Sequence, residues 1–394
     1  MFARYAFARS HVPLTTPSAR IAAFNRVTTT MRHFSTAKKP PTAVLLTNMG
    51  GPETLDDVHD FLLNLFSDRD IMKLPLQKHL AKYIANRRTP SIKEQYAQIG
   101  GGSPILAWTQ KQGEAMEKIL DKISPETAPH KHYIAFRYVK PSTDMALEEM
   151  KKDGVQRAVV FTQYPQYSCS TTGSSLNELH RGIVRAGMED LDWSIIDRWP
   201  KHPGFIEAVA KRIEAKLQEY PAEERDNAVI LFSAHSLPMS VVNRGDTYPS
   251  EVAHTVHQVM ERLGQKYQYR LVWQSQVGPQ PWLGPQTSDA IKGYGEAGKK
   301  NLLLVPIAFT TDHIETLFEL DLEYGKEAEE AGITGFKRAE SLNDDPTFVQ
   351  AMADIVKEHL QEGGIVSKQW YLRCPGCTFD SCGTTREFFA SKEK

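Results

Sequence analysis

Short apolar runs alternate along this chain with longer segments of helical periodicity. The runs have the character of buried parallel strands, and they span Thr42–Asn48, His132–Tyr138, Arg157–Gln163, Trp193–Asp197, Ala228–Ser233, Tyr269–Gln274, Leu302–Phe309 and Phe336–Ala339. Helical patterns between them cover Thr143–Lys152, Ser174–Ala186, Pro203–Glu219, Ser250–Leu263 and Thr287–Ala297. Strands that alternate with helices predict an α/β protein with parallel sheets and right-handed crossovers.

The predicted strands form two similar series of four, which suggests two Rossmann-like domains with four-stranded parallel sheets flanked by helices. We expect them over residues 40–200 and 201–345, followed by a C-terminal helix and a cysteine-rich tail over 346–394. The first crossover, from Asn48 to His132, is much longer than its counterpart in the second series. A crossover helix needs only about a dozen residues, so residues from about 55 to 105 are predicted to be an insertion.

The insertion is rich in apolar and basic residues. Ile71–Lys93 contains no Asp or Glu but several Lys and Arg. This composition is typical of a segment that rests on anionic lipid or holds an anionic, apolar ligand. A helix packed on the core with a solvated basic face explains the same pattern about equally well.

The charge balance excludes some classes of function. The chain has 47 basic and 48 acidic residues, and no basic domain stands out, which argues against nucleic acid as a partner. No run of 18 apolar residues is present to span a membrane as a helix. The first 39 residues contain Arg, Ser and Thr but no acid before Glu53, the composition of a mitochondrial transit peptide rather than of an ordinary basic tail.

A carboxylate row follows the seventh predicted strand. Asp312, Glu315, Glu319 and Glu323 are spaced i, i+3, i+7 and i+11, beside His313. One face of a helix beginning at Thr311 would carry them, with Asp312 and Glu315 as a capping box. A solvated acidic face is the simplest interpretation. The row nevertheless begins at the carboxyl end of a strand, where open α/β sheets bind ligands, and there it would carry a cation inward or protons outward.

Polar residues also follow several other strands, and these strand ends are expected to line one shared cleft. They are Asn48-Met49, Phe136-Arg137-Tyr138, Gln163-Tyr164, Ser233-Ala234-His235-Ser236 and Trp273-Gln274-Ser275. His235 directly follows an apolar strand. A buried structural histidine and a functional one are about equally consistent with that position.

The cysteines point to a metal centre. Cys374, Cys377 and Cys382 have the spacing C-x2-C-x4-C, and Cys169 lies in the loop after the third strand. Four thiols clustered in this way in a reducing compartment favour metal over disulfides. The spacing alone fits tetrahedral zinc or a [2Fe–2S] cluster, and zinc is the first choice on these grounds.

Four motifs together resemble the family of mitochondrial ferrochelatases, and the likeness extends from residue 42 to the end. The motifs are Leu46–Pro52, Gln163–Ser168, Phe232–Pro238 and Pro306–Glu315. The resemblance implies insertion of ferrous iron into protoporphyrin IX, giving protohaem and two protons. It also implies peripheral association with the matrix side of the mitochondrial inner membrane, and a homodimer.

The resemblance implies a catalytic set made of His235, Glu315, Asp312, His313, Glu319, His202 and Asp354. In it, His235 faces the centre of the macrocycle with Glu315 opposite. His202 and Asp354 form a separate pair for which the residues themselves give no reason.

The substrate-binding set that the resemblance implies is Met49, Arg88, Tyr96, Ser103, Arg137, Tyr138 and Trp282. Arg137 and Tyr138 belong to the face that handles incoming iron. The cysteine pattern resembles the family's [2Fe–2S] ligands, and this moves the expectation from zinc to the cluster. The alternatives are a chelatase for another tetrapyrrole or metal, a porphyrin or haem carrier, and a cluster-based electron carrier.

Overall fold

The computed structural model describes residues 39–71, 74–371, 374–377 and 379–392. The predicted transit peptide over residues 1–39 therefore lies outside the described residues, except for Lys39, and so does Lys73 of the insertion. Among the described helices, none is both long enough and apolar enough to cross a membrane.

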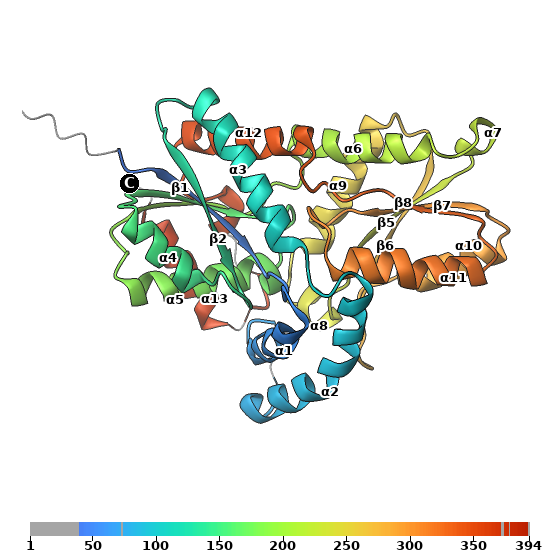
Figure 1. Ribbon diagram of the computed structural model, residues 1–394, viewed down its shortest axis with the longest axis horizontal. Coiled ribbons are helices and arrows are strands. Elements are labelled where there is room, and N and C mark those ends of the chain that lie inside the picture. Colours follow the sequence, from blue (N-terminus) through green and yellow to red (C-terminus); the bar gives the residue numbers. More distant parts are fainter. Residues whose placement is uncertain (1–38, 72–73, 372–373, 378, 393–394) are drawn as a thin grey trace, which may run out of the picture. The chain divides into compact units, whose positions relative to one another are not determined.

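Two parallel four-stranded sheets form the framework (Figure 1). The first has the order β2-β1-β3-β4 and the second the order β6-β5-β7-β8. The strands are β1 (Thr42–Asn48), β2 (His130–Phe136), β3 (Arg157–Thr162), β4 (Asp192–Ile196), β5 (Val229–His235), β6 (Gln268–Gln274), β7 (Asn301–Pro306) and β8 (Gly335–Arg338). Both halves thus repeat one topology, and the predicted α/β class with two four-stranded parallel sheets is confirmed.

Helices cover both faces of each sheet (Figure 1). They are α1 (Val58–Ser67), α2 (Gln77–Gln98), α3 (Ile105–Ile123), α4 (Thr143–Lys152), α5 (Ser174–Ala186), α6 (Pro203–Leu217), α7 (Ala222–Arg225), α8 (Met239–Val242), α9 (Tyr248–Arg262), α10 (Thr287–Glu296), α11 (Tyr324–Glu330), α12 (Pro346–Glu362) and α13 (Asp380–Ala390). The other helical segments are η1 (Leu55–Asp57), η2 (Cys169–Gly173), η3 (Glu315–Glu323) and η4 (Lys368–Tyr371). Of these, η2 and η3 are π-helices.

The alternation of side chains along each strand divides the core between the two faces of the sheets. In β1, Val44 and Leu46 face a large core that also contains Ile230 and Phe232 of β5. Ala43, with Leu45, faces a second core beneath α4 and α5. Alternate residues of each strand face the same side of the sheet. Because β1 and β5 both turn such residues toward the large core, this core joins the two halves.

The segment after β1 forms α1 and α2, which pack with a small apolar cluster of their own. Phe61 and Leu62 of α1 meet Ala81 and Ala85 of α2 there, beside Tyr138. The cluster is separate from the large cores, so this segment is supported by less buried surface than the sheets are.

Candidate active site

The carboxyl ends of the strands open into one large cavity of about 890 Å³. Its lining includes Asn48 at the end of β1, Arg137 after β2, Gln163 after β3 and His235 at the end of β5. These strand ends were expected to meet, since the carboxyl edge of a parallel sheet is where ligands bind. A volume of this size is within the range that buries a large organic ligand.

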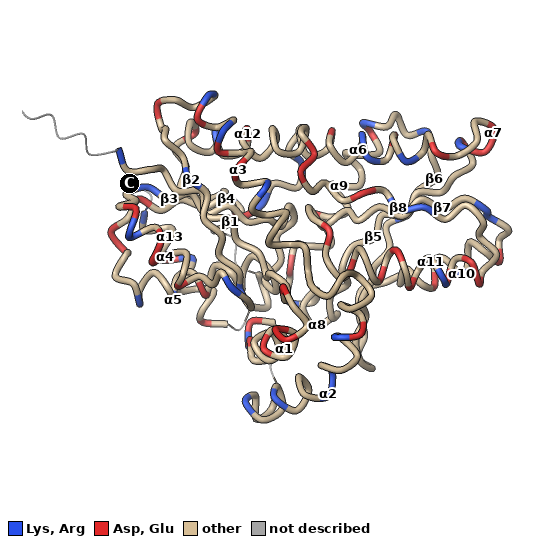
Figure 2. The backbone as a smooth tube through the Cα atoms, in the orientation of Figure 1, with Lys and Arg blue, Asp and Glu red and all other residues tan. Residues whose placement is uncertain are grey.

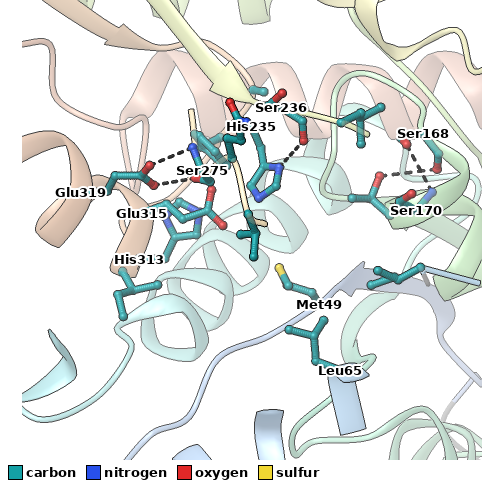
Figure 3. A pocket seen from close by; sticks show the side chains of 18 of the residues that line it. Met49, Leu65, Ser168, Ser170, His235, Ser236, Ser275, His313, Glu315 and Glu319 are labelled. Carbon is teal, nitrogen blue, oxygen red and sulfur yellow. Dashed lines mark hydrogen bonds between the residues drawn. The ribbon is translucent and has the colours of Figure 1, made fainter. Parts of the chain in front are cut away.

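His235 projects into the cavity from the end of β5 (Figure 3). Its Nδ1 lies 2.6 Å from the carbonyl oxygen of Ser236. A carbonyl oxygen only accepts, so Nδ1 carries the proton and Nε2 of the neutral ring keeps its lone pair. That lone pair is able to take a proton or to ligate a metal ion. The ring also lies 6.4 Å from the Trp282 ring.

Glu315 and His313 hold the most unusual polar atoms of the site. Within the described part of the chain, Oε2 of Glu315 and Nδ1 of His313 are buried and have no hydrogen-bond partner. Burial raises the pKa of Glu315 to about 7. A positive charge on His235 opposes this rise, and the negative charge of Glu319 adds to it. Burial also lowers the pKa of His313 to about 4. Near neutral pH, Glu315 therefore exchanges a proton readily, whereas His313 stays neutral.

Further carboxylates continue from Glu315 along the cavity wall, and they belong to Glu319, Glu323 and Glu327. Glu319 is fixed by the Ser275 backbone N–H at 2.9 Å and the Ser275 hydroxyl at 2.6 Å (Figure 3). The Tyr324 hydroxyl also donates to it at 2.9 Å. A π-helix closes each turn with i→i+5 bonds, so residues four apart stay nearly in line. The file of carboxylates therefore follows the wall instead of winding away from it.

Asp312 does not belong to this file, and the predicted capping box is wrong. The helix begins at Glu315 after Ile314, and neither residue caps it through a side chain. Asp312 is absent from the cavity lining. Its carboxylate accepts hydrogen bonds from Ser341 at 2.7 Å and Asn343 at 2.8 Å, and pairs with Arg338 at 3.3 Å. The chain between β7 and the helix is thus a loop held by tertiary contacts.

The wall built by the first half carries Arg137 and Tyr138. Both contact the buried carboxylate of Asp68, the Tyr138 hydroxyl at 2.7 Å and the guanidinium at 3.2 Å. Ser174 at the start of α5 donates to the same oxygen at 2.5 Å. Every polar group in this cluster has a partner, so the wall offers a fixed arrangement of polar groups in which the Arg137 charge is balanced by Asp68.

The other predicted substrate contacts also line the cavity: Met49, Arg88, Tyr96, Ser103 and Trp282. Met49 is aimed inward by the turn after β1 (Figure 3), where Gly50 has φ +77° and a Cβ would lie 2.4 Å from Val139. Tyr96 is buried, which raises the pKa of its phenol. Helix α2 thus contributes one side of the cavity mouth, and Trp282 contributes another.

His202 and Asp354 lie outside the cavity lining. His202 precedes α6, with its Nε2 3.5 Å from Glu358 of α12. Asp354 accepts a hydrogen bond from Gln350 on α12 at 3.0 Å. The structure gives this pair no contact with the groups described above.

The four cysteines line a second, much smaller cavity of about 20 Å³. Cys169 comes from η2, and Cys374, Cys377 and Cys382 come from the C-terminal tail. Burial raises the pKa of the Cys169, Cys374 and Cys382 thiols. Arg244 lies 3.6 Å from the Cys169 sulfur, and Arg386 also lines this cavity. Within the described ranges, no three donor residues converge closely enough to hold a single metal ion.

Three positions at or beside the cavity were not predicted from the sequence. Tyr248, at the start of α9, is buried in the cavity wall, and burial raises the pKa of its phenol. Glu327 extends the carboxylate file, and Arg338 binds Asp312 from behind. Arg338 lies within the predicted strand Phe336–Ala339, and Glu327 continues the four-residue spacing of Glu319 and Glu323, so both had a usable signal. Tyr248 precedes the predicted helix Ser250–Leu263 and had none.

Comparison with known proteins assigns the family. The profile of the family described as ferrochelatase matches residues 41–360. Mitochondrial ferrochelatase of Xenopus laevis is 60% identical over 91% of this chain and 87% of its own. The proteins of that name from Homo sapiens and Drosophila melanogaster are 60% and 51% identical, over 90% and 89% of this chain and 85% and 92% of their own. With the strand ends converging on one cavity and a histidine facing a buried carboxylate there, the chain belongs to the ferrochelatase family.

Proposed function

We propose that His235 and Glu315 are the pair that passes iron to the porphyrin and receives its two protons. As a ferrochelatase, the chain inserts ferrous iron into protoporphyrin IX in haem biosynthesis. The balance of the reaction is simple, because Fe²⁺ replaces the two pyrrole N–H protons and no electron is transferred. The protein therefore has to supply loose metal ligands and proton acceptors around the macrocycle.

The observation that carries the proposal is the state of the polar atoms in the second half's wall. Glu315 Oε2 and His313 Nδ1 are buried and have no partner among the described residues, and His235 Nε2 is left free by the Ser236 contact. An unsatisfied buried polar atom costs about 1–3 kcal/mol. Such atoms persist at sites where a ligand satisfies them.

The chemistry of these donors fits metal insertion. Imidazole and carboxylate are both able to replace waters of Fe²⁺ without the tight hold of a thiolate set. A carboxyl group with a pKa of about 7 accepts a proton from a pyrrole nitrogen and releases it again near neutral pH. The file from Glu319 to Glu327 then provides successive acceptors along the cavity wall.

The decisive experiment is an anaerobic assay with Fe²⁺ and protoporphyrin IX, followed by loss of free-porphyrin fluorescence. Wild-type protein is expected to turn over many equivalents, and His235→Ala to fall by about 10²-fold or more, as for loss of a general base. His257→Ala is the matched control, because His257 is an exposed histidine on α9. Loss of one equivalent only would indicate a carrier, and near-wild-type turnover in His235→Ala would exclude the assigned role.

We also propose that the four cysteines hold a [2Fe–2S] cluster. The thiols line one cavity together, and a two-iron cluster needs only two cysteines for each iron, whereas tetrahedral zinc needs its ligands around one point. Cationic Arg244 and Arg386 beside the thiols oppose part of the rise in thiol pKa that burial causes. The cluster when bound supplies a cross-link between the tail and the first half.

Purified protein is then expected to contain about two irons and two acid-labile sulfides per chain, with visible colour. Cys377→Ser should lose both the colour and part of the thermal stability, since the tail loses its cross-link. Stoichiometric zinc without labile sulfide in native protein would contradict this assignment.

We propose that the surface around the start of α2, a helix whose later part lines the cavity, rests on anionic lipid at the matrix face of the mitochondrial inner membrane. Leu76 is 80% exposed and Tyr83 59% exposed. The part of α2 that precedes Glu94 carries basic residues and no acidic ones (Figure 2). Exposed apolar side chains beside cations are the composition of an interfacial helix.

The proposed membrane contact of α2 is tested with liposomes. Mature protein is expected to bind anionic vesicles, and less strongly as salt rises, because part of the attraction is screened charge. Leu76→Ser combined with Tyr83→Ser should weaken binding. Met145→Ser combined with Val184→Ser is the matched control, since these residues are exposed on α4 and α5. Equal binding by both double variants would place the membrane contact elsewhere. A homodimer remains an expectation from the resemblance, and sedimentation of the mature chain measures it.

A further inference from the structure

Arg338 joins two acidic residues that flank the reactive groups. Its guanidinium forms a two-pronged contact with Asp321 of η3, through Nε at 2.5 Å and Nη2 at 2.8 Å. The remaining nitrogen, Nη1, lies 3.3 Å from Asp312 in the loop before η3. The side chain is only 11% exposed. One cation therefore contacts the chain both before the helix and within it.

The contacts of Asp312 mark it as an anchor for the loop. Its Oδ1 accepts from Ser341 and Thr316, and its Oδ2 accepts from Asn343. The Asn343 side-chain oxygen accepts the Asp312 backbone N–H at 2.8 Å, which completes a reciprocal pair. Its donors and the neighbouring Arg338 lower the pKa of Asp312, burial acting in the opposite direction. A carboxylate so fully engaged, outside the cavity lining, is poorly suited to pass a metal ion.

The contact with Asp321 acts on the helix that carries the carboxylate file. Asp321 lies two residues from Glu319 and from Glu323, and unlike them it does not line the cavity. A π-helix is rare and less favourable than an α-helix, so surrounding contacts have to maintain it. A bidentate guanidinium–carboxylate contact fixes both distance and orientation.

His313 and Glu315 stand between these two anchor points. Their unpartnered atoms favour relaxation of the loop toward any donor or toward water. A reactive constellation of this kind needs support from the residues behind it, because a displacement of about 1 Å can cost 10²-fold in rate. The support on this side comes from the Arg338 contacts.

We propose that Arg338 is a positioning residue for iron insertion: it holds Asp312 and Asp321 together and thereby sets the places of His313 and Glu315 in the cavity. Asp312 acts with it as the loop anchor and does not handle iron. The proposal rests on the proposed roles of His235 and Glu315, and the test separates the two.

The test is steady-state kinetics with Fe²⁺ and protoporphyrin varied in turn. Arg338→Met and Asp312→Asn are each expected to lower kcat about tenfold or more with KM for iron unchanged. Arg338→Lys should recover part of the loss, because lysine keeps the positive charge but cannot bind both oxygens of Asp321 as the guanidinium does. The double variant should lose less than the two single losses combined, since both changes remove the shared contact between Arg338 and Asp312.

Two variants keep the test decisive. Arg212→Met is the matched control, because Arg212 also bridges two acidic residues, Glu340 at 2.9 Å and Asp345 at 3.5 Å, away from the cavity lining. If Arg338→Met does not fold, Asp321→Asn breaks only the helix side of the contact and is expected to show the same kinetic pattern.

The proposal is overturned if Arg338→Met or Asp321→Asn loses no more kcat than Arg212→Met at equal thermal stability. It is also overturned if Asp312→Asn raises KM for iron while kcat is retained, or if the single losses add in the double variant. Glu315→Gln is measured in the same series: if it keeps its turnover, the proposed reactive pair fails, whatever Arg338 does.

Discussion

The two halves of the molecule share one sheet topology but build opposite kinds of wall around the cavity. In the first half, the cluster of Asp68 with Tyr138, Arg137 and Ser174 is fully paired, and Gln163 Oε1 is the exception among the described residues of that wall. In the second half, Glu315 and His313 keep polar atoms for which the described residues provide no partner. The same framework thus supports a satisfied cluster on one wall and an unsatisfied cluster on the other.

The difference separates binding from chemistry. A cluster whose hydrogen bonds are complete is rigid, which suits recognition of a ligand's outline. Unsatisfied buried groups raise the free energy of the empty site, and binding of a metal ion or a proton lowers it. We therefore expect changes in the second wall to affect turnover, and matched changes in the first wall to affect it much less.

The largest expected effect is on turnover. Glu315→Gln removes the proton acceptor and should lower kcat by about 10²-fold or more, while porphyrin still binds through its buried edge. Tyr138→Phe, which removes one donor from the satisfied wall, should leave kcat near the wild-type value. Stopped assays at saturating iron and porphyrin measure both. Equal losses in the two variants would end the distinction between the walls.

The next effect is on the pH dependence of kcat. Glu315 has a pKa of about 7 because of burial, and it accepts protons only when ionised. Turnover should therefore fall by about tenfold per pH unit below that pKa and level off above it. His313, with its pKa lowered to about 4, should add no further step between pH 5 and 8. A profile that is flat from pH 5.5 to 8 would show that no group of the second wall titrates in catalysis.

The smallest effect is on stability, and its sign is opposite to that on activity. Burial raises the pKa of Glu315 from 4.5 to about 7, so the folded state favours the protonated form. The resulting destabilisation is absent below about pH 4.5, grows as pH rises and is complete above about pH 7. Glu315→Gln should thus gain about 1–3 kcal/mol over wild type at pH 8 and little at pH 4.5, measured by urea unfolding. A variant less stable than wild type at pH 8 would mean that the carboxylate is well accommodated.

The framework could be predicted from the sequence because its signals are local. Apolar runs located each strand, and the structure moved their ends by three residues or fewer, as for β7, predicted over Leu302–Phe309 and observed over Asn301–Pro306. Helices α4 and α5 begin and end where their patterns predict. The grouping of strand-end residues in one cavity followed from topology alone.

The details of the second wall could not be predicted, because tertiary contacts decide them. The spacing of Asp312 and Glu315 matches a capping box, yet Asp312 is bound by Ser341, Asn343 and Arg338, which are distant in sequence. The π-helical turn has no signature in an apolar pattern. A carboxylate row drawn on an α-helix beginning at Thr311 therefore included Asp312, which does not line the cavity.

Gln112 of α3 has a consequence for how the cavity fills and empties. This buried amide from the first half donates to the carbonyl oxygen of Asn343 at 2.7 Å and to that of Thr310 at 3.5 Å, directly behind the reactive loop. These hydrogen bonds connect the two halves behind the loop that carries His313 and Glu315. Helices α1 and α2, by contrast, pack on a small apolar cluster of their own. We therefore expect the motion that admits a flat macrocycle to involve α1 and α2, while the loop behind Glu315 stays in place. Amide hydrogens of α2 should accordingly exchange with solvent well before those of α3.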